Sequence, residues 1–119
     1  QLQVAVTFSG ERIVNTGLSK TGRPYVWGST GPNSFDCSGF TQWVYRQNGI
    51  YIPRTSSEQK AAAKKVVSLS ELEVGDILWR SGHVGIYIGN GRYVHAPHTG
   101  DVVKVSSGVG KFTCGLRYQ

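Results

Sequence analysis

Methionine is absent from this sequence, and no run of apolar residues approaches the ~20 that a membrane-spanning helix requires. The N-terminus also lacks the basic and then apolar layout of a secretory signal peptide. We therefore expect no membrane insertion, and we expect the chain to be a processed product or a domain cut from a longer protein. Its 119 residues are enough for one domain, residues 1–119, with a single core.

Cysteine is almost as scarce, because Cys37 and Cys114 are the only two. Two thiols this far apart match neither a C-x-x-C metal motif nor the dense disulfide framework of small secreted domains. One interpretation is a Cys37–Cys114 disulfide. The other, which we favour, is that Cys114 is a buried strand residue, since it lies in the apolar run 112–118. The two cysteines then have different roles.

Acidic residues are also few, with 7 against 13 Lys and Arg, so the net charge is +6. Such a surface is either simply solvated or attracts polyanions such as an acidic cell wall, phospholipid head groups or nucleic acid. The densest basic cluster, Lys60, Lys64 and Lys65, lies in an alanine-rich segment typical of one exposed helical face. Because this differs from the basic stripe of a nucleic-acid interface, we expect no nucleic-acid partner.

The first half of the chain has helical patterns, and the second half has strand patterns. We predict a helix over residues 9–20, capped by Ser9 and ended by Gly22, and a second one that carries Cys37 and stops at Asn48-Gly49. A third helix begins near Ser56, where Ser56 and Gln59 have capping-box spacing, and continues through residues 61–63. β-Branched and aromatic residues predict strands at 76–79, 83–89, 92–96, 102–106 and 112–118. This is an α+β pattern with an antiparallel meander of about five strands.

Cys37 lies where an irregular loop, residues 28–34, gives way to this second helix. Unpaired N–H groups and the positive end of the helix dipole favour an anion in the first turn. We therefore expect a lowered thiol pKa and an accessible thiolate at Cys37, which are the properties of a nucleophile.

A nucleophilic thiol needs a base, and the chain has only three histidines. Imidazole suits this task because its pKa lies near neutrality. His83 follows Ser81-Gly82 and opens the predicted strand 83–89, so its ring is expected at a strand end that a cleft can reach. His95 lies on the next strand and is our candidate for the group that orients the His83 ring, ahead of His98 and of a purely structural role for His95.

The face of His95 depends on the turn between the two strands. A two-residue loop of Asn90 and Gly91 would place His95 opposite Ile86, on the face away from His83. A three-residue loop that also includes Gly89 would place His95 opposite Gly85, on the same face as His83. We predict this second register, in which Gly85 leaves space beside the two rings.

Six motifs follow one another along the chain: Tyr25-Val26-Trp27-Gly28, Asp36-Cys37-Ser38-Gly39-Phe40, Pro53-Arg54-Thr55-Ser56, Gly75-Asp76-Ile77-Leu78, His83-Val84-Gly85-Ile86-Tyr87-Ile88-Gly89 and Val94-His95-Ala96. Together they resemble the NlpC-type cell-wall peptidases of the papain-like superfamily over residues 13–118. The resemblance implies a papain-like α+β fold, in which a Cys-bearing helix packs on an antiparallel sheet. It also implies hydrolysis of peptidoglycan stem peptides, typically between γ-D-glutamate and the following diamino acid, by a secreted protein of the cell wall or periplasm.

Within this resemblance, Cys37 matches the nucleophile, His83 the base and His95 the polar third member of the triad. Tyr25 matches a tyrosine near the oxyanion position, and its alternative role is packing in the core.

Three further residues match positions near the substrate. Asp36 and Ser38 match residues that in some members hold the amino end of the stem peptide; the alternatives are a helix cap for Asp36 and bonds to first-turn backbone for Ser38. Arg54 matches a polar position at the cleft rim, or it is an exposed surface residue. The pair Trp79-Arg80 departs from the smaller apolar or aromatic residues expected before the Ser-Gly-His segment.

Other functions use similar residues. A papain-like amidase or acyltransferase acting on another substrate would need the same Cys-His-polar group. A non-catalytic module that binds wall peptides is a rival of another class, as is a zinc site formed by Cys37, His83 and His95. We expect no metal and no cofactor, because a thiol at a helix start already has a base. We also expect a monomer, with a separate wall-binding domain as an option in a longer protein.

Overall fold

The computed structural model describes the backbone of residues 2–118 and the side chains of residues 10–118. Three α-helices, two short 3₁₀ helices and six strands form the α+β arrangement that the sequence predicts. The helices are α1 (Leu2–Leu18), α2 (Cys37–Gln47), α3 (Ser56–Ala62), η1 (Leu69–Glu71) and η2 (Val109–Lys111). The strands are β1 (Lys65–Val67), β2 (Ile77–Arg80), β3 (His83–Gly89), β4 (Arg92–His95), β5 (Lys104–Ser107) and β6 (Cys114–Arg117).

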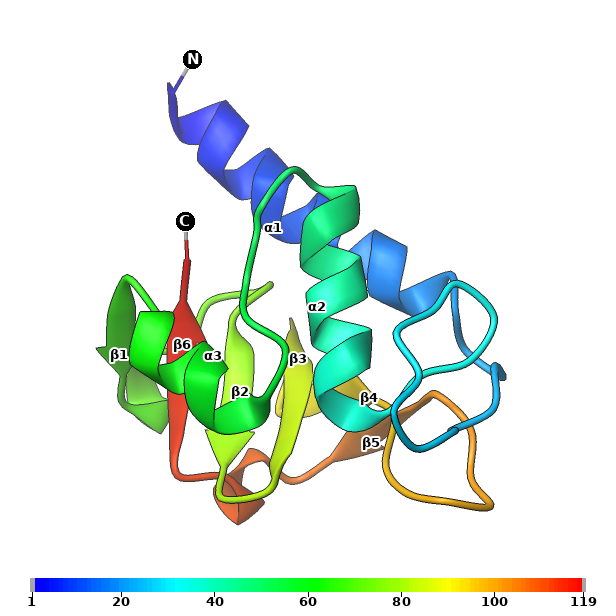
Figure 1. The fold of residues 1–119 in the computed structure, drawn as a ribbon. Helices are drawn as coiled ribbons and strands as arrows, with labels where there is room; N and C mark the ends of the chain where they lie inside the picture. Colours follow the sequence, from blue (N-terminus) through cyan, green and yellow to red (C-terminus); the bar gives the residue numbers. More distant parts are fainter. Residues whose placement is uncertain (1, 119) are drawn as a thin grey trace.

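The strands form one antiparallel sheet in the order β1-β6-β2-β3-β4-β5 (Figure 1). Strands β2 to β5 are the predicted meander, whereas β6 returns to pair between β1 and β2. The prediction of about five strands missed β1. Lys65 and the two valines after it pair with β6, so Lys64 and Lys65 do not continue the helical face of Lys60.

One predicted helix start and one predicted helix cap are wrong. Helix α1 begins at Leu2, so Ser9 lies inside it and is not its cap. Helix α3 has a capping box one residue earlier than predicted, formed by Thr55 and Glu58. Gln59 is instead fully buried, where its side-chain amide donates to the backbone oxygens of Ser38 and Pro53. It therefore ties α3 to the start of α2.

The last two predicted strands are shorter or shifted in the structure. Strand β5 begins at Lys104, because Val103 exchanges backbone hydrogen bonds with Gly22 and Arg23 instead. Strand β6 begins at Cys114, because Phe112 ends the 3₁₀ helix η2. Strand β3 has the predicted bounds, and β2 differs from its prediction by one residue at each end.

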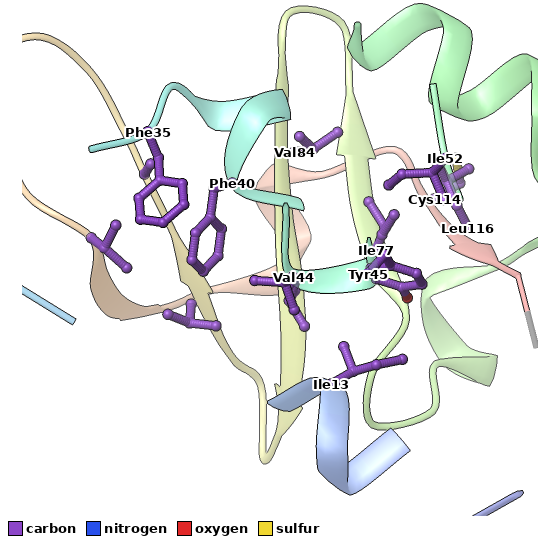
Figure 2. Packing of buried hydrophobic residues seen from close by; sticks show 14 residues of the cluster. Ile13, Phe35, Phe40, Val44, Tyr45, Ile52, Ile77, Val84, Cys114 and Leu116 are labelled. Carbon is purple, nitrogen blue, oxygen red and sulfur yellow. The ribbon is translucent and has the colours of Figure 1, made fainter. Parts of the chain in front are cut away.

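Both faces of the sheet are covered. Helices α1 and α2 pack on the face that carries Val84 and Ile86 of β3, where Ile13, Phe40 and Val44 fill the main core (Figure 2). Side chains alternate along strands, so the residues between these point to the other face. There a smaller cluster gathers Leu78, Tyr93 and Phe112.

His83 and His95 therefore lie on the side of the sheet away from α2, whereas Cys37 lies at the start of α2.

Among the described residues, none of the helices is long and apolar enough to span a membrane.

Candidate active site

Cys37 is the first residue of α2, as predicted, and Asp36 is the N-cap. The Asp36 backbone is extended, and its carboxylate accepts a hydrogen bond from the Gly39 N–H at 2.7 Å. The Asp36 N–H donates to the Ser29 carbonyl at 2.9 Å, which holds the preceding loop against the helix. A Cβ at Gly39 would lie 2.2 Å from that same carbonyl oxygen, so only glycine fits there. The Asp-Cys-Ser-Gly sequence thus fixes the thiol locally.

Asp36, Ser38 and Arg54 form one network beside the thiol. The Arg54 guanidinium donates to both carboxylate oxygens of Asp36, at 3.1 and 2.6 Å, and to the Ser38 hydroxyl at 2.8 Å. The Gly28 N–H is a further donor to Asp36, at 3.0 Å. Asp36 is only 6% exposed, so a bidentate arginine and two amides compensate its buried charge. Arg54 is therefore a structural partner of Asp36 and not a free surface residue.

A cavity of about 450 Å³ opens over this network. Its lining includes Cys37 and all four residues that the sequence analysis placed near the substrate or the oxyanion position, which are Tyr25, Asp36, Ser38 and Arg54. Trp27 also lines it and is 83% exposed, a contact residue that the sequence analysis did not single out. The sequence could have indicated this role, because an aromatic side chain next to a glycine in a loop is seldom buried in the core.

The Cys37 thiol lies against the backbone on both sides of His83. Its sulfur is 4.0 Å from the Gly82 carbonyl oxygen, and the Val84 N–H is among its hydrogen-bond donors. Among the described residues, the thiol has no hydrogen bond to the ring of His83, the base expected for it, in this structure.

The expectation of a lowered thiol pKa is also wrong. Burial first, and then the charge of Asp36, raise the pKa of Cys37 above its ordinary value. The backbone N–H groups at the helix start lower the pKa, as predicted, but their effect is the smaller one. The thiol is therefore protonated at neutral pH in the resting structure.

His83 and His95 lie on the same face, as predicted, and His83 Nε2 is 2.8 Å from His95 Nδ1. The predicted turn is wrong, although the register is right. Gly89 pairs with Arg92 around a two-residue loop, and a bulge between Tyr87 and Gly89 then supplies the extra residue. Beyond the bulge, Ile86 pairs with Val94, which brings Gly85 opposite His95. A Cβ at Gly85 would lie 3.2 Å from the His95 Cβ, so glycine does leave space there.

The chain of hydrogen bonds continues to a residue that the sequence analysis missed. His95 Nε2 lies 2.9 Å from the Ser106 hydroxyl on β5. Sequence alone offers Ser106 and Ser107 equally, and only the pairing of Tyr93 with Ser106 decides which hydroxyl shares the face of His95. Tyr93 packs edge-on against His95 and Phe112 stacks on His83, so both rings are held by aromatic contacts as well.

Burial keeps both histidines neutral. The pKa of each ring is lowered to about 4, by burial first and, for His83, by the nearby charge of Arg80 as well. Among the described residues, His83 Nδ1 has no hydrogen-bond partner. If His95 donates from Nε2 to Ser106, it accepts at Nδ1 from His83 Nε2, and His83 Nδ1 is then an unprotonated base.

Cys114 is a free, buried thiol on β6, as we favoured, and no disulfide joins it to Cys37. Within residues 10–118, whose side chains are described, no group of three or more His, Cys, Asp or Glu is arranged to hold a metal ion.

Trp79 was unexpected at its position in the sequence. Its indole N–H donates to the Ser56 carbonyl at 2.9 Å, so it links β2 to α3.

Comparison with known proteins shows the family to which the chain belongs. The NlpC/P60 family model matches residues 22–113. A probable endopeptidase of Corynebacterium glutamicum is 53% identical over 91 residues, which are 74% of this chain and 43% of the relative. The bifunctional muramidase/DL-endopeptidase CwlT of Bacillus subtilis is 40% identical over 99 residues, 76% of this chain and 30% of that protein. The chain thus spans less than half the length of either relative.

The fold is also similar to that of solved structures of this family. The crystal structure of the NlpC/p60 domain of the peptidoglycan hydrolase SagA matches with a TM-score of 0.81 and 41% identity, over 90% of this chain and 97% of that one. Three helices on a six-stranded antiparallel sheet are therefore the papain-like arrangement of these domains, as the resemblance implies.

Proposed function

Because this chain belongs to the NlpC/P60 family, we propose that it is a cysteine endopeptidase that hydrolyses the stem peptides of bacterial peptidoglycan. The bond cleaved is the one between γ-D-glutamate and the following diamino acid. Catalysis uses Cys37, His83 and His95, without a metal or cofactor, and the protein acts after export, in the cell wall or periplasm. The observation that supports this most is the thiol at the helix start, held against the backbone of a histidine whose ring is fixed by a second histidine.

The first step joins the Cys37 sulfur to the scissile carbonyl carbon. His83 Nδ1 takes the thiol proton as the sulfur attacks, because both groups are neutral beforehand. The carbonyl oxygen becomes an oxyanion, which the N–H of Cys37 and the hydroxyl of Tyr25 stabilise. The carbon–nitrogen bond then breaks, His83 gives its proton to the leaving amine, and a thioester remains.

The second step consumes one water molecule. His83 removes a proton from the water, and the oxygen bonds to the thioester carbon. The carbon–sulfur bond breaks, the free carboxyl product leaves, and the proton returns to sulfur. His95 holds the ring of His83 in one orientation and accepts from its Nε2 in both steps. It is thus a positioning residue.

The hydrogen bonds of the residues beside the thiol indicate a different role for each of them. Four donors already occupy the Asp36 carboxylate, so it holds the loop, the helix and Arg54 in place. We assign the amino end of the stem peptide to Tyr25, Asp36 and Ser38, which all border the cavity, with Asp36 acting through its negative charge.

Digestion of peptidoglycan from a defined source, with mass spectrometry of the products, tests this proposal. The wild-type protein should release fragments cut after γ-D-glutamate, and Cys37→Ala should lower the rate by at least about 10⁴-fold. The Cys114→Ala variant is the matched control, because that thiol is buried away from the cavity, and it should cleave normally. Thermal unfolding should show that Cys37→Ala still folds.

Three results would point elsewhere. Retained cleavage by Cys37→Ala would remove the cysteine from the mechanism. Binding of wall peptides without cleavage by the wild type would identify a binding module. Products from another amide or an acyl-transfer reaction would identify the related chemistries.

A further inference from the structure

A second cavity, of about 280 Å³, lies beyond Gly82 from the thiol. Gly82 lines both cavities, while His83 and His95 line only this second one. The reacting centre therefore lies on the boundary, with one space on the side of Cys37 and another on the side of the base.

The second cavity is basic. Arg80, at the end of β2, His98, and Lys111, at the end of η2, line it, and its lining includes no Asp or Glu. Their positive charge reaches the histidines, since Arg80 lowers the pKa of His83 and Lys111 that of His95. The cavity thus favours an anion.

Two of these basic residues have no partner of their own among the described side chains. His98 lies 3.5 Å from the Asp101 carboxylate, which also binds Lys104. By contrast, neither Arg80 nor Lys111 forms an ion pair or a side-chain hydrogen bond with any residue whose side chain the structure describes. Other arginines, such as Arg54 and Arg117, are each paired with a buried aspartate. Two cations from separate elements therefore face one cavity without a counter-charge.

The position of the base assigns this cavity to one half of the substrate. His83 protonates the leaving amine, so the leaving half lies on the His83 side when the bond breaks. The acyl half, attached to sulfur, lies on the side of Cys37. With 280 Å³, the second cavity is below the size typical of a drug-like ligand site and suits a short segment.

We infer that Arg80 and Lys111 select substrates by binding a free carboxylate on the leaving half of the stem peptide. This inference rests on the proposed function. A guanidinium offers two parallel N–H donors that match a carboxylate, and an ammonium adds a point charge. The carboxylate comes either from the side chain of the diamino acid or from the C-terminus of a peptide that ends there. Amidation of that group would remove the charge that the cavity recognises.

Four synthetic peptides distinguish these sources. All begin with L-Ala-γ-D-Glu. Three of them end in diaminopimelate: one has both carboxylates free, one has the side-chain carboxylate amidated, and one has the C-terminal carboxylate amidated. The fourth ends in lysine with a free C-terminal carboxylate. The wild type should cleave the fully free peptide with a kcat/KM about 10-fold higher than the peptide in which the recognised carboxylate is amidated. The amidation that causes the loss identifies the source.

The variants Arg80→Gln and Lys111→Gln should lose most of this preference, with little change in their rate on the amidated peptide. Arg92→Gln is the control, since Arg92 is exposed on β4 and lines neither cavity. All three side chains are exposed, so folding should be unaffected.

The outcomes separate the two proposals. Equal cleavage of all four peptides by the wild type, or equal loss on all four by the variants, would overturn the carboxylate inference alone. Cleavage of none of them would overturn the proposed function and, with it, this inference.

Discussion

The two sides of the candidate active site are built by different means. On the helix side, a buried carboxylate, an arginine and backbone amides hold the start of α2, and the links through the Asp36 carboxylate are charge-assisted. On the sheet side, His83 and His95 are neutral, and strand register, hydrogen bonds and aromatic contacts hold them. The thiol is thus placed mainly by its neighbours in sequence, together with Arg54, and the base by residues of other segments.

This difference explains the protonation states as well. Burial and the negative charge of Asp36 raise the pKa of the thiol, while burial and nearby cations lower those of the histidines. Both changes favour neutral groups, so the proton moves from sulfur to imidazole only when the substrate is attacked.

The largest effect is expected on the helix side, at Gly39. An alanine there would place its Cβ 2.2 Å from the Ser29 carbonyl oxygen and 2.8 Å from the Asp36 carboxylate. Gly39→Ala should lower the free energy of unfolding by about 3 kcal/mol, because neither group can move without breaking the cap. Urea unfolding measures this. Gly110→Ala is the control, since nothing lies within 4 Å of its Cβ position. Equal stability of the two variants would mean that the helix start is not the rigid side.

Removal of the arginine should have the next largest effect. Arg54→Ala leaves the buried Asp36 carboxylate with amide donors alone, and should lower the free energy of unfolding by about 2 kcal/mol. The loss is moderated because the Arg54 side chain is 34% exposed. Arg54→Lys keeps the charge but not the two parallel hydrogen bonds, so its free energy of unfolding should lie between those of the wild type and Arg54→Ala. If both variants unfold like the wild type, the network does not stabilise this side.

The sheet side should respond to pH. The unfolded chain binds protons at its histidines from about pH 6.5, whereas the folded rings resist protonation until about pH 4. The unfolded state therefore binds more protons in this interval, and the free energy of unfolding falls as the pH falls from 6.5 towards 4. Urea unfolding at several pH values checks this, and His95→Asn should flatten the profile. An unchanged profile in that variant would show that His95 titrates normally.

The smallest effect is expected at the far end of the histidine chain. Ser106→Ala removes the acceptor for His95 Nε2, and should lower kcat/KM about tenfold because the ring orientation and tautomer are less well fixed. The pH profile of the activity should shift as well, which loss of stability alone would not cause. Ser107→Ala, on the other face of β5, should do neither. Equal activity of the two variants would remove Ser106 from the positioning chain.

Much of the site could be predicted because its signals are local. The start of α2 follows from the loop, the cap and the helical pattern within a few residues of Cys37. The bounds of β3 follow from its β-branched residues and flanking glycines. The cap of α3 was misplaced by one residue because Thr55 and Ser56 both suit that position, and only the burial of Gln59 decides between them.

Other features lay beyond local patterns. The bulge near Ile88 has no signature of its own, so the right register was reached through the wrong turn. The sign of the thiol pKa depends on how deeply the chain buries Cys37, and the helix start alone predicts the opposite.

The sequence by itself determined the α+β class and the helix that begins at Cys37, because both rest on neighbours along the chain, and it singled out Cys37, His83 and His95 as candidates. The tertiary structure decided which serine supports His95, which cations face the base, and whether the thiol is charged. These depend on strand pairing and on burial, which arise only when distant segments pack together.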